Sequence, residues 1–177
     1  MHSYVALLRA VNVGGTAKAP AAALKTIAEG LGFEDVQTLL QSGNLTFRAD
    51  GEPQTLEAKL ERAFAAELGL STEVMVRDAA DWSALIAANP FPKESKRDPS
   101  HVLAVVTKDQ PRPEGVKALQ DYPGPERIEA GERVLYIVYP EGIGRSKLNG
   151  APGWKKLGCS GTGRNWNTVL KLAERLG

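Results

Sequence analysis

The stretch PFPKESKRDPS, residues 90–100, separates two similar halves of the sequence and decides its organisation. It carries three prolines and several charged residues, a composition that is typical of a linker. The same order of strand-like and helix-like patterns precedes it and follows it. We therefore expect an N-terminal subdomain with a connecting helix at 1–89, a linker at 90–100, and a C-terminal subdomain at 101–177.

The half before the linker begins with YVALLRAV, which is apolar on both faces as in a buried strand. Apolar residues recur later at helical spacing, and Gly32 and Gly69 are placed to end two helices. Two strand-like runs flank Ser42-Gly43 and predict a β-hairpin. The elements that we predict here are a strand at 4–11, a helix at 20–31, hairpin strands at 35–41 and 44–49, a helix at 56–68, a strand at 72–77 and a helix at 78–88.

The half after the linker repeats this order. We predict a strand at 101–108, a helix at 113–122, a hairpin that turns near Gly131, and a C-terminal helix that opens with RNWN at 164–167. The first strand and the hairpin glycine are 39 residues apart in the first half and 30 in the second, and the longer loop NVGGTAKA accounts for the difference. The order predicts an α+β fold of two ferredoxin-like β-α-β-β-α subdomains related by degenerate duplication.

Composition excludes several broad classes. The 177 residues are 42% hydrophobic and 24% charged, which allows a packed core and argues against global disorder. The net charge of +1 argues against a protein that coats nucleic acid or a membrane surface without specificity. Any anion binding must therefore come from a local arrangement of residues.

Metal and thiol chemistry have little support in the sequence. The single cysteine, Cys159, allows no disulfide within the chain, and His2 and His101 have no ligand spacing to each other or to it. We predict no metal site and no cofactor, and we interpret Cys159 as a small structural thiol rather than a nucleophile.

Targeting signals are equally sparse. The N-terminal MHSYVALLRAV has no basic start and reads as a strand rather than a signal peptide. No run approaches the ~18 apolar residues of a membrane helix. We expect a cytoplasmic protein without a membrane partner.

One candidate anion site is the loop GGTAK, residues 14–18, between a predicted strand and a predicted helix. Backbone N–H groups of Gly14 and Gly15 in this context can receive a phosphate, and Lys18 can add charge. The spacing fits neither of the two common phosphate-loop patterns. The alternative is that the glycines only form a flexible turn.

A second candidate is the start of the predicted last helix, at Arg164, Asn165 and Asn167, together with the basic residues Arg145 and Lys147. Asn165 or Thr162 can cap the helix alone. A cation at a helix N-terminus is unfavourable unless an anion joins it, so Arg164 needs a negative partner. That partner is either a bound phosphate or carboxylate, or a carboxylate from elsewhere in the chain.

Arg9 poses a similar question, because it shares a face with apolar residues of the first strand and needs a partner if it is buried. Asn12 follows at the end of that strand, while Gln41, Ser42 and Asn44 cluster at the hairpin turn. In a β-α-β-β order these two places need not share a sheet end. We therefore treat them as separate candidates.

Three segments, YVALLRAVNVGG, LGFEDVQTLLQSGNLTF and RNWNTVLKLAE, together resemble the bacterial domain of unknown function 1697 family. Its motifs read close to ALLRGINVGG, VQTYIQSGNVVF and TARNWNTV, and this sequence departs from them at Ala10 and at Gly161 to Gly163. The resemblance spans nearly the whole chain and implies two related α/β subdomains, but no activity. It makes the polar motif residues the natural functional candidates, although turns and caps need the same residue types.

Three functions remain open. The one we favour is binding of a small phosphate-bearing ligand, for example a nucleotide, through the Gly-rich loops and a helix N-terminus. The second is a single-stranded nucleic-acid module, although NLTFRA does not match the RNA-recognition strand pattern. The third is a scaffold or interaction protein without a small-molecule ligand. No acid–base pair is visible, so the sequence leaves open whether the protein is an enzyme, and it leaves the oligomeric state open too.

Overall fold

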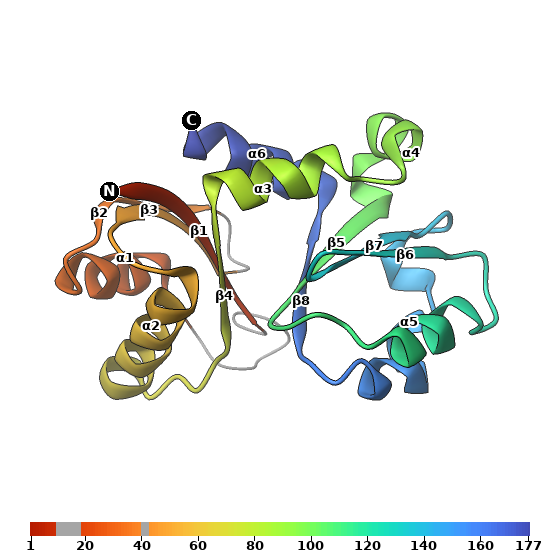
Figure 1. The fold of residues 1–177 in the computed structure, drawn as a ribbon, viewed down its shortest axis with the longest axis horizontal. Coiled ribbons are helices and arrows are strands. Elements are labelled where there is room, and N and C mark those ends of the chain that lie inside the picture. The colour runs from red at the N-terminus through yellow and green to blue at the C-terminus, as the bar shows by residue number, and fades with distance from the viewer. Residues whose placement is uncertain (10–18, 40–42) are drawn as a thin grey trace. The chain divides into compact units, whose positions relative to one another are not determined.

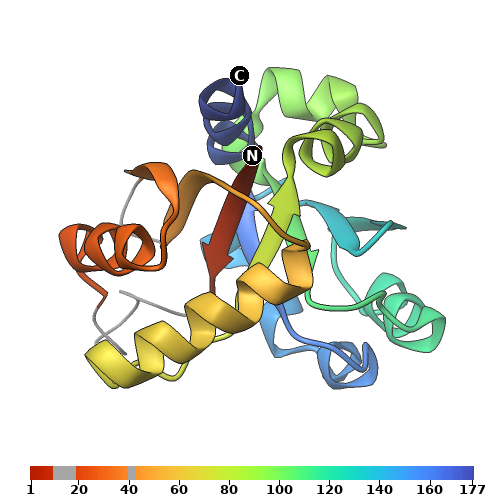
Figure 2. The same ribbon diagram turned by 60° about the vertical axis from the view of Figure 1, so that its left-hand side comes forward.

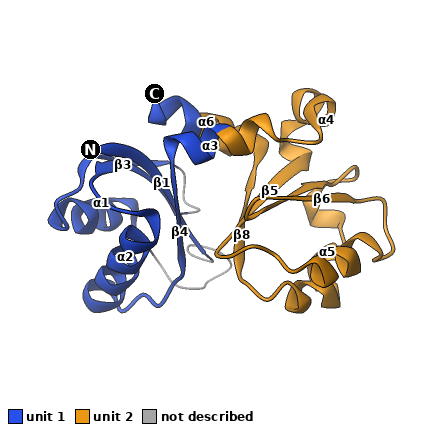
Figure 3. Ribbon diagram, in the orientation of Figure 1, with its two compact units in different colours: residues 1–83, 172–177 blue, residues 84–171 orange. Residues whose placement is uncertain are grey.

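The computed structural model describes residues 1–9, 19–39 and 43–177. The chain forms two compact units (Figure 3): unit 1 comprises residues 1–83 and 172–177, and unit 2 comprises residues 84–171. None of the helices in the described part of the chain combines the length and the hydropathy that a bilayer crossing requires.

Unit 1 is an antiparallel sheet with two helices on one face (Figures 1 and 2). Its elements are β1 (His2–Leu8), α1 (Ala21–Gly30), β2 (Glu34–Leu39), β3 (Asn44–Ala49), α2 (Pro53–Leu68) and β4 (Val74–Asp78), followed by α3 (Ala79–Ala87). The strand order is β2-β3-β1-β4, which is the order of a ferredoxin-like sheet.

The core of unit 1 follows from two periodicities. Alternate residues of β1, namely Tyr4, Ala6 and Leu8, point to the helix-covered face because successive strand side chains alternate. Residues three and four apart on the helices, such as Leu56 and Leu60 of α2, meet them there. The resulting cluster is buried and continuous, so it holds both helices on the same face.

The predicted helix ends are confirmed. Gly69 closes α2 in the left-handed conformation (φ 60°), which costs an L-residue with a Cβ more than it costs glycine. Gly32 follows the end of α1 with φ 87°. Both glycines therefore stop their helices where the sequence pattern placed the stops.

Unit 2 repeats the sheet. Its elements are α4 (Pro92–Arg97), β5 (Val102–Thr107), α5 (Pro113–Gln120), β6 (Arg127–Gly131), β7 (Val134–Val138), β8 (Gly161–Asn165) and α6 (Trp166–Leu176), with a 3-10 turn at Pro99–His101 and three more at Ile143–Arg145, Leu148–Gly150 and Pro152–Lys156. The strand order β6-β7-β5-β8 matches that of unit 1 strand by strand. The α+β fold with two similar subdomains is thus confirmed.

The correspondence extends to single hydrogen bonds at the sheet ends. At the end of β1, the Leu8 N–H donates to the Gly43 carbonyl (2.9 Å), and at the end of β5 the Thr107 N–H donates to the Arg133 carbonyl (3.0 Å). The next residue repeats the match: the Arg9 N–H donates to the Glu73 carbonyl (3.0 Å), and the Lys108 N–H donates to the Ser160 carbonyl (2.9 Å). Two units that agree at this level are copies of one topology.

One detail of the predicted duplication differs. We expected the C-terminal helix to be the second helix of the second copy, but α6 directly follows β8 as α3 directly follows β4. The place of α2 is taken in unit 2 by the three 3-10 turns after β7. Leu148 in these turns, and Ala151 and Leu157 directly after them, are buried and cover the sheet as α2 does in unit 1. Short turns suffice there because they still deliver apolar side chains to the core.

The segment 90–100, which the composition predicts to be a linker, is part of unit 2. Phe91 and Ser95 are buried, and helix α4 starts with Pro92 at its first position, where proline's missing N–H costs nothing. The unit boundaries fall instead at 83/84, within α3, and at 171/172, within α6. Proline at a helix start and proline in a linker look alike in sequence, which explains the difference.

Candidate functional site

The sheet of unit 1, which we call sheet 1, brings three chain segments together at the end where β1 stops; the sheet of unit 2 is sheet 2. The Leu8 N–H donates to the Gly43 carbonyl (2.9 Å), the Arg9 N–H donates to Glu73 (3.0 Å), and the Thr72 hydroxyl donates to the Arg9 carbonyl (2.7 Å). This follows from the antiparallel pairing of β1 with both β3 and β4, which sets the exit of β1 beside the entry of its neighbours. The strand exit and the hairpin turn, which we treated as separate candidates, thus leave the sheet at the same end.

Arg9 lies just beyond β1, and its side chain is exposed. The expectation that it belongs to an apolar strand face is therefore wrong, because β1 ends at Leu8, one residue earlier. Among the described residues only its backbone is engaged, through Thr72 and Glu73. Its guanidinium is thus a solvent-facing positive charge at the sheet end.

Six of the predicted ligand-binding residues lie outside the described residues: Asn12, Gly14, Gly15, Lys18, Gln41 and Ser42. The structure does describe the residues on either side of them. Gly43 has φ 77°, and Asn44 is 1% exposed and donates its side-chain amide to the Leu39 carbonyl (2.8 Å). Asn44 therefore braces the hairpin turn from the inside.

The RNWN segment does not have the geometry that we predicted. Arg164 is the second-last residue of β8, whose backbone pairs with β5 from Leu103 to Thr107, and α6 begins only at Trp166. The predicted alternative of an Asn165 cap is confirmed, because its side-chain oxygen accepts the Thr168 N–H (3.1 Å). Arg164 does not need an anion to offset a positive helix end, contrary to the prediction, since strand pairing places its backbone outside the helix.

Arg164 is nevertheless unusual, because its side chain is only 5% exposed. One guanidinium nitrogen donates to the Thr162 hydroxyl (2.7 Å) and to the Gly163 carbonyl (2.9 Å), two neutral acceptors on its own strand. Burial lowers the pKa of Arg164 from 12.5 to about 10, so the group stays charged at neutral pH.

The other candidates near this segment are solvent-facing. Asn167 is exposed in the first turn of α6. Arg145 and Lys147 are exposed in the 3-10 turns that follow β7. Arg164 differs from these basic residues because it is buried in a strand.

Arg77, the counterpart of Arg164 in unit 1, is not among the residues predicted from the sequence. It is the second-last residue of β4, is 3% exposed, and lies 3.9 Å from a carboxylate oxygen of Glu57. The next residue, Asp78, caps α3 by accepting the Asp81 N–H (2.7 Å), as Asn165 caps α6. Comparing MVRD with TGRN across the two halves would have revealed this pair.

Thiol and metal chemistry find no support in the described part of the chain. Its His, Cys, Asp and Glu residues form no group of three that could hold a metal ion. Burial raises the pKa of the Cys159 thiol, which donates weakly to the Asp109 carbonyl (3.4 Å). A raised pKa lowers the thiolate fraction, so the group is a poor nucleophile.

Comparison with known proteins gives a family and a fold. The model of the family described as "Protein of unknown function (DUF1697)" matches residues 1–136. No curated protein matches the chain. The structure of the conserved bacterial protein SP0830 from Streptococcus pneumoniae is similar, with a TM-score of 0.78, 23% sequence identity and 99% of each chain covered. At this identity the likeness concerns the fold alone.

Proposed function

The chain belongs to the DUF1697 family of proteins of unknown function, and we propose that it binds a small phosphate-bearing ligand at the end of sheet 1 where β1 stops. The single observation that carries this proposal is the 2.9 Å hydrogen bond from the Leu8 N–H to the Gly43 carbonyl. It means that the end of β1 and the start of β3 lie side by side at one end of the sheet. In the sequence, the Gly-rich motif follows β1 directly and the polar motif precedes β3 directly, so the proposal assigns both to one ligand.

The difference between the two copies supports a function at this end of unit 1. Twelve residues, 9–20, join β1 to α1, whereas five residues, 108–112, join β5 to α5. Long loops in compact domains are usually functional, because a short connection would suffice for the fold.

The short connection 108–112 of unit 2 also stabilises the neighbouring hairpin. Gln110 accepts the Arg133 N–H (2.8 Å) and donates to the Gly131 carbonyl (3.1 Å), which closes the turn between β6 and β7. Unit 2 therefore shows what the topology needs at this sheet end. The additional residues in unit 1 are extra to that need and are available for binding.

Charge at this end favours an anionic ligand. The exposed guanidinium of Arg9 stands at the β1 exit, and the loop sequence adds Lys18 and the paired Gly14 and Gly15. Guanidinium and backbone N–H donors together are the usual recognition elements for phosphate.

A thermal-shift screen of the full chain tests the proposal. The panel contains inorganic phosphate, nucleoside mono-, di- and triphosphates, sugar phosphates, the matched unphosphorylated compounds, and single-stranded oligonucleotides. A ligand present at 100 times its dissociation constant adds about 2.7 kcal/mol of stability, which is a rise in melting temperature of roughly 5–10 °C for a chain of this size. Only phosphorylated small molecules should produce it.

Two variants then locate the site. Arg9→Ala should weaken binding of the best compound by about tenfold, because a charge-assisted contact is lost, and should leave the melting temperature of the free protein unchanged. Arg62→Ala removes another exposed arginine, on α2, and should bind as the wild type does. A flat screen, or equal losses in both variants, would contradict the proposal. A response to oligonucleotides alone would favour the nucleic-acid alternative.

A further inference from the structure

The segment 90–100, which the proposed function leaves unused, forms one wall of a cleft in unit 2. The cleft has a volume of about 370 Å³ and lies where β5 and β6 begin and β7 ends. Its volume falls in the range of small-molecule sites. It belongs entirely to unit 2 and is a different place from the sheet-1 end of the proposed function.

The floor of the cleft is a row of paired strand residues. Val102 pairs with Val138, and Val138 pairs with Arg127, so the three side chains point to the same face of sheet 2. Val102 and Val138 are almost wholly buried (0% and 5% exposed), so they lie beneath the floor and make it apolar, while Arg127 at the end of the row carries a charge.

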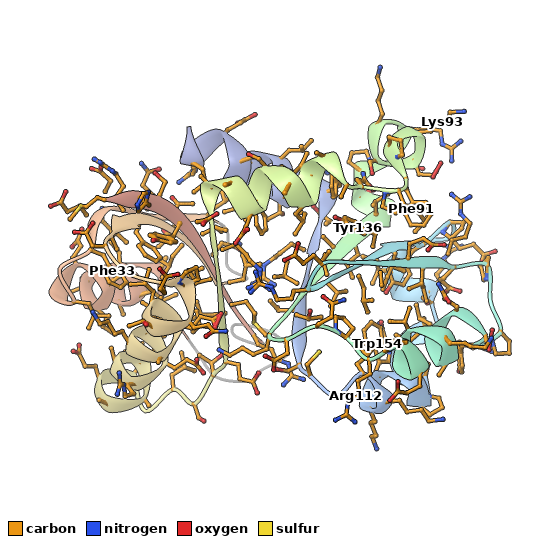
Figure 4. The ribbon with its side chains drawn as sticks, viewed as in Figure 1. Phe33, Phe91, Lys93, Arg112, Tyr136 and Trp154 are labelled. Carbon is orange, nitrogen blue, oxygen red and sulfur yellow. The ribbon has the colours of Figure 1, made fainter. Side chains whose placement is uncertain are left out.

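Arg127 is held in place from two sides. It donates to the Glu94 carboxylate (2.7 Å), and its guanidinium lies over the ring of Phe91, 4.9 Å from the ring centre. Phe91 is labelled in Figure 4. Phe91 itself is fixed by the hydrogen bond from its N–H to the Asn89 side chain (2.9 Å). A guanidinium has five N–H donors, and only one is used within the described residues, so the others remain for a ligand.

The opposite charge comes from the end of α4. Asp98 lies 3.8 Å from the His101 ring, and its carboxylate is half exposed. Arg97, also on the cleft wall, makes no polar side-chain contact among the described residues. Two arginines and two carboxylates line the cleft besides His101, so the formal charges of these four side chains sum to zero.

We propose that this cleft binds a small zwitterion that carries an ammonium and a carboxylate, such as a free α-amino acid or a dipeptide. A ligand with a net charge would leave one of the site's charges unmatched, whereas a zwitterion matches both kinds. The ligand's carboxylate pairs with Arg97 and the open donors of Arg127. Its ammonium pairs with Asp98 and Glu94, and its aliphatic part rests on Val102 and Val138.

Isothermal titration calorimetry of the full chain tests this inference. The probes are L-alanine, L-glutamine and glycylglycine, each compared with its C-terminal amide, which lacks the negative charge, and its N-acetyl form, which lacks the positive charge. At least one zwitterion should bind, and both of its modified forms should bind about tenfold or more weakly, because each leaves charged partners unpaired.

Charge variants of the cleft give the second readout. Arg97→Ala and Asp98→Asn should each weaken binding of the zwitterion by about tenfold, since each removes one charged partner. Their matched controls, Lys96→Ala and Glu141→Gln, change exposed charged residues that do not line the cleft and should have no effect. All four positions are exposed, so the melting temperature should stay that of the wild type.

Three results would overturn the inference: no zwitterion binds, the modified forms bind as well as the parent compound, or Arg97→Ala binds as the Lys96→Ala control does. None of them bears on the sheet-1 site, whose own variants concern Arg9. The two proposals therefore fail or succeed separately.

Discussion

Arg77 and Arg164 occupy the same position in the two copies of the sheet. Each is the second-last residue of an edge strand, is buried, and pairs with the equivalent residue of the central strand, Val5 or Ala104. Each also donates to the carbonyl of the residue before it. A buried arginine at the end of the fourth strand is thus a feature of the repeated unit, and we interpret it as a residue that stabilises the fold.

Replacing Arg164 by lysine tests how much this position depends on guanidinium geometry. The Nη1 nitrogen alone donates to both the Thr162 hydroxyl and the Gly163 carbonyl, and the lysine side chain is one bond shorter, so its ammonium does not reach the position of Nη1. We expect the free energy of unfolding of Arg164→Lys to fall by about 1–3 kcal/mol, measured by urea denaturation. The exposed Arg62→Lys is the control and should stay within about 0.5 kcal/mol of the wild type.

The residues after the two arginines should behave as helix caps. Asp78→Ala and Asn165→Ala each remove the acceptor of an N–H in the first turn, so each should lower the free energy of unfolding by about 1 kcal/mol. Asn167→Ala changes an exposed asparagine two positions further on and should cost less than about 0.5 kcal/mol. Equal losses at Asn165 and Asn167 would contradict the cap assignment.

Stability should fall in alkali because of two buried tyrosines. Burial raises the pKa of Tyr136 and of Tyr139 from 10.0 to about 12. The folded protein then keeps protons that the unfolded chain releases, so the stabilising contribution is complete below pH 10 and is lost as the pH rises towards 12. The free energy of unfolding, measured from about pH 9 to about pH 11.5, should show this slope.

Tyr136→Phe checks the assignment of that slope. The variant should lose part of the alkaline slope, and at neutral pH it should be less stable by about 1 kcal/mol, because the Tyr136 hydroxyl donates to the Leu85 carbonyl (2.6 Å). Tyr122→Phe, at a half-buried position, is the matched control. If Tyr136→Phe keeps the full slope, the ionisation of this residue is not its source.

Two glycine-to-alanine substitutions should have opposite effects. A Cβ at Gly115 in α5 would lie 2.6 Å from backbone atoms of Lys156 and Leu157, which cannot move as a side chain can. Gly115→Ala should therefore lower the free energy of unfolding by about 1–3 kcal/mol. A Cβ at Gly30 in α1 meets nothing within 4 Å, so Gly30→Ala should raise it by about 0.5 kcal/mol. Thermal melts that rank the two variants the other way would refute the packing argument.

Much of the fold was predictable because its signals are local. The continuous apolar run of β1, the helical spacing in α2 and the glycine at the end of α2 are each visible within a few residues, and the repeated order of elements follows from them. Strand β8 was not predictable in this way. Gly161 and Gly163 weaken any strand pattern, and the segment is extended because β5 offers it a ladder, which is a tertiary effect.

The candidate sites depend on strand order, which the sequence pattern does not contain. The end of β1 and the start of β3 become neighbours only because β1 lies between β3 and β4 in the sheet. The cleft in unit 2 is harder to predict from the sequence. Its lining residues His101 and Arg127 are 26 positions apart and come to the same place through the pairing of β5 and β6 with β7. The segment that supplies its wall carried prolines that favoured a linker.

The division of the chain into two units has a consequence for its folding during synthesis. Unit 2 is one continuous stretch, but unit 1 contains residues 172–177, where Arg175 donates to the Gln37 side chain (3.0 Å) and the Thr38 carbonyl (3.1 Å) on β2. A ribosome delivers those residues after all of unit 2. Synthesis of residues 40–174, about three quarters of the chain, therefore separates the edge strand β2 from its contact with Arg175. A nascent polypeptide stalled before Arg175 should accordingly be cleaved by proteases at that strand first.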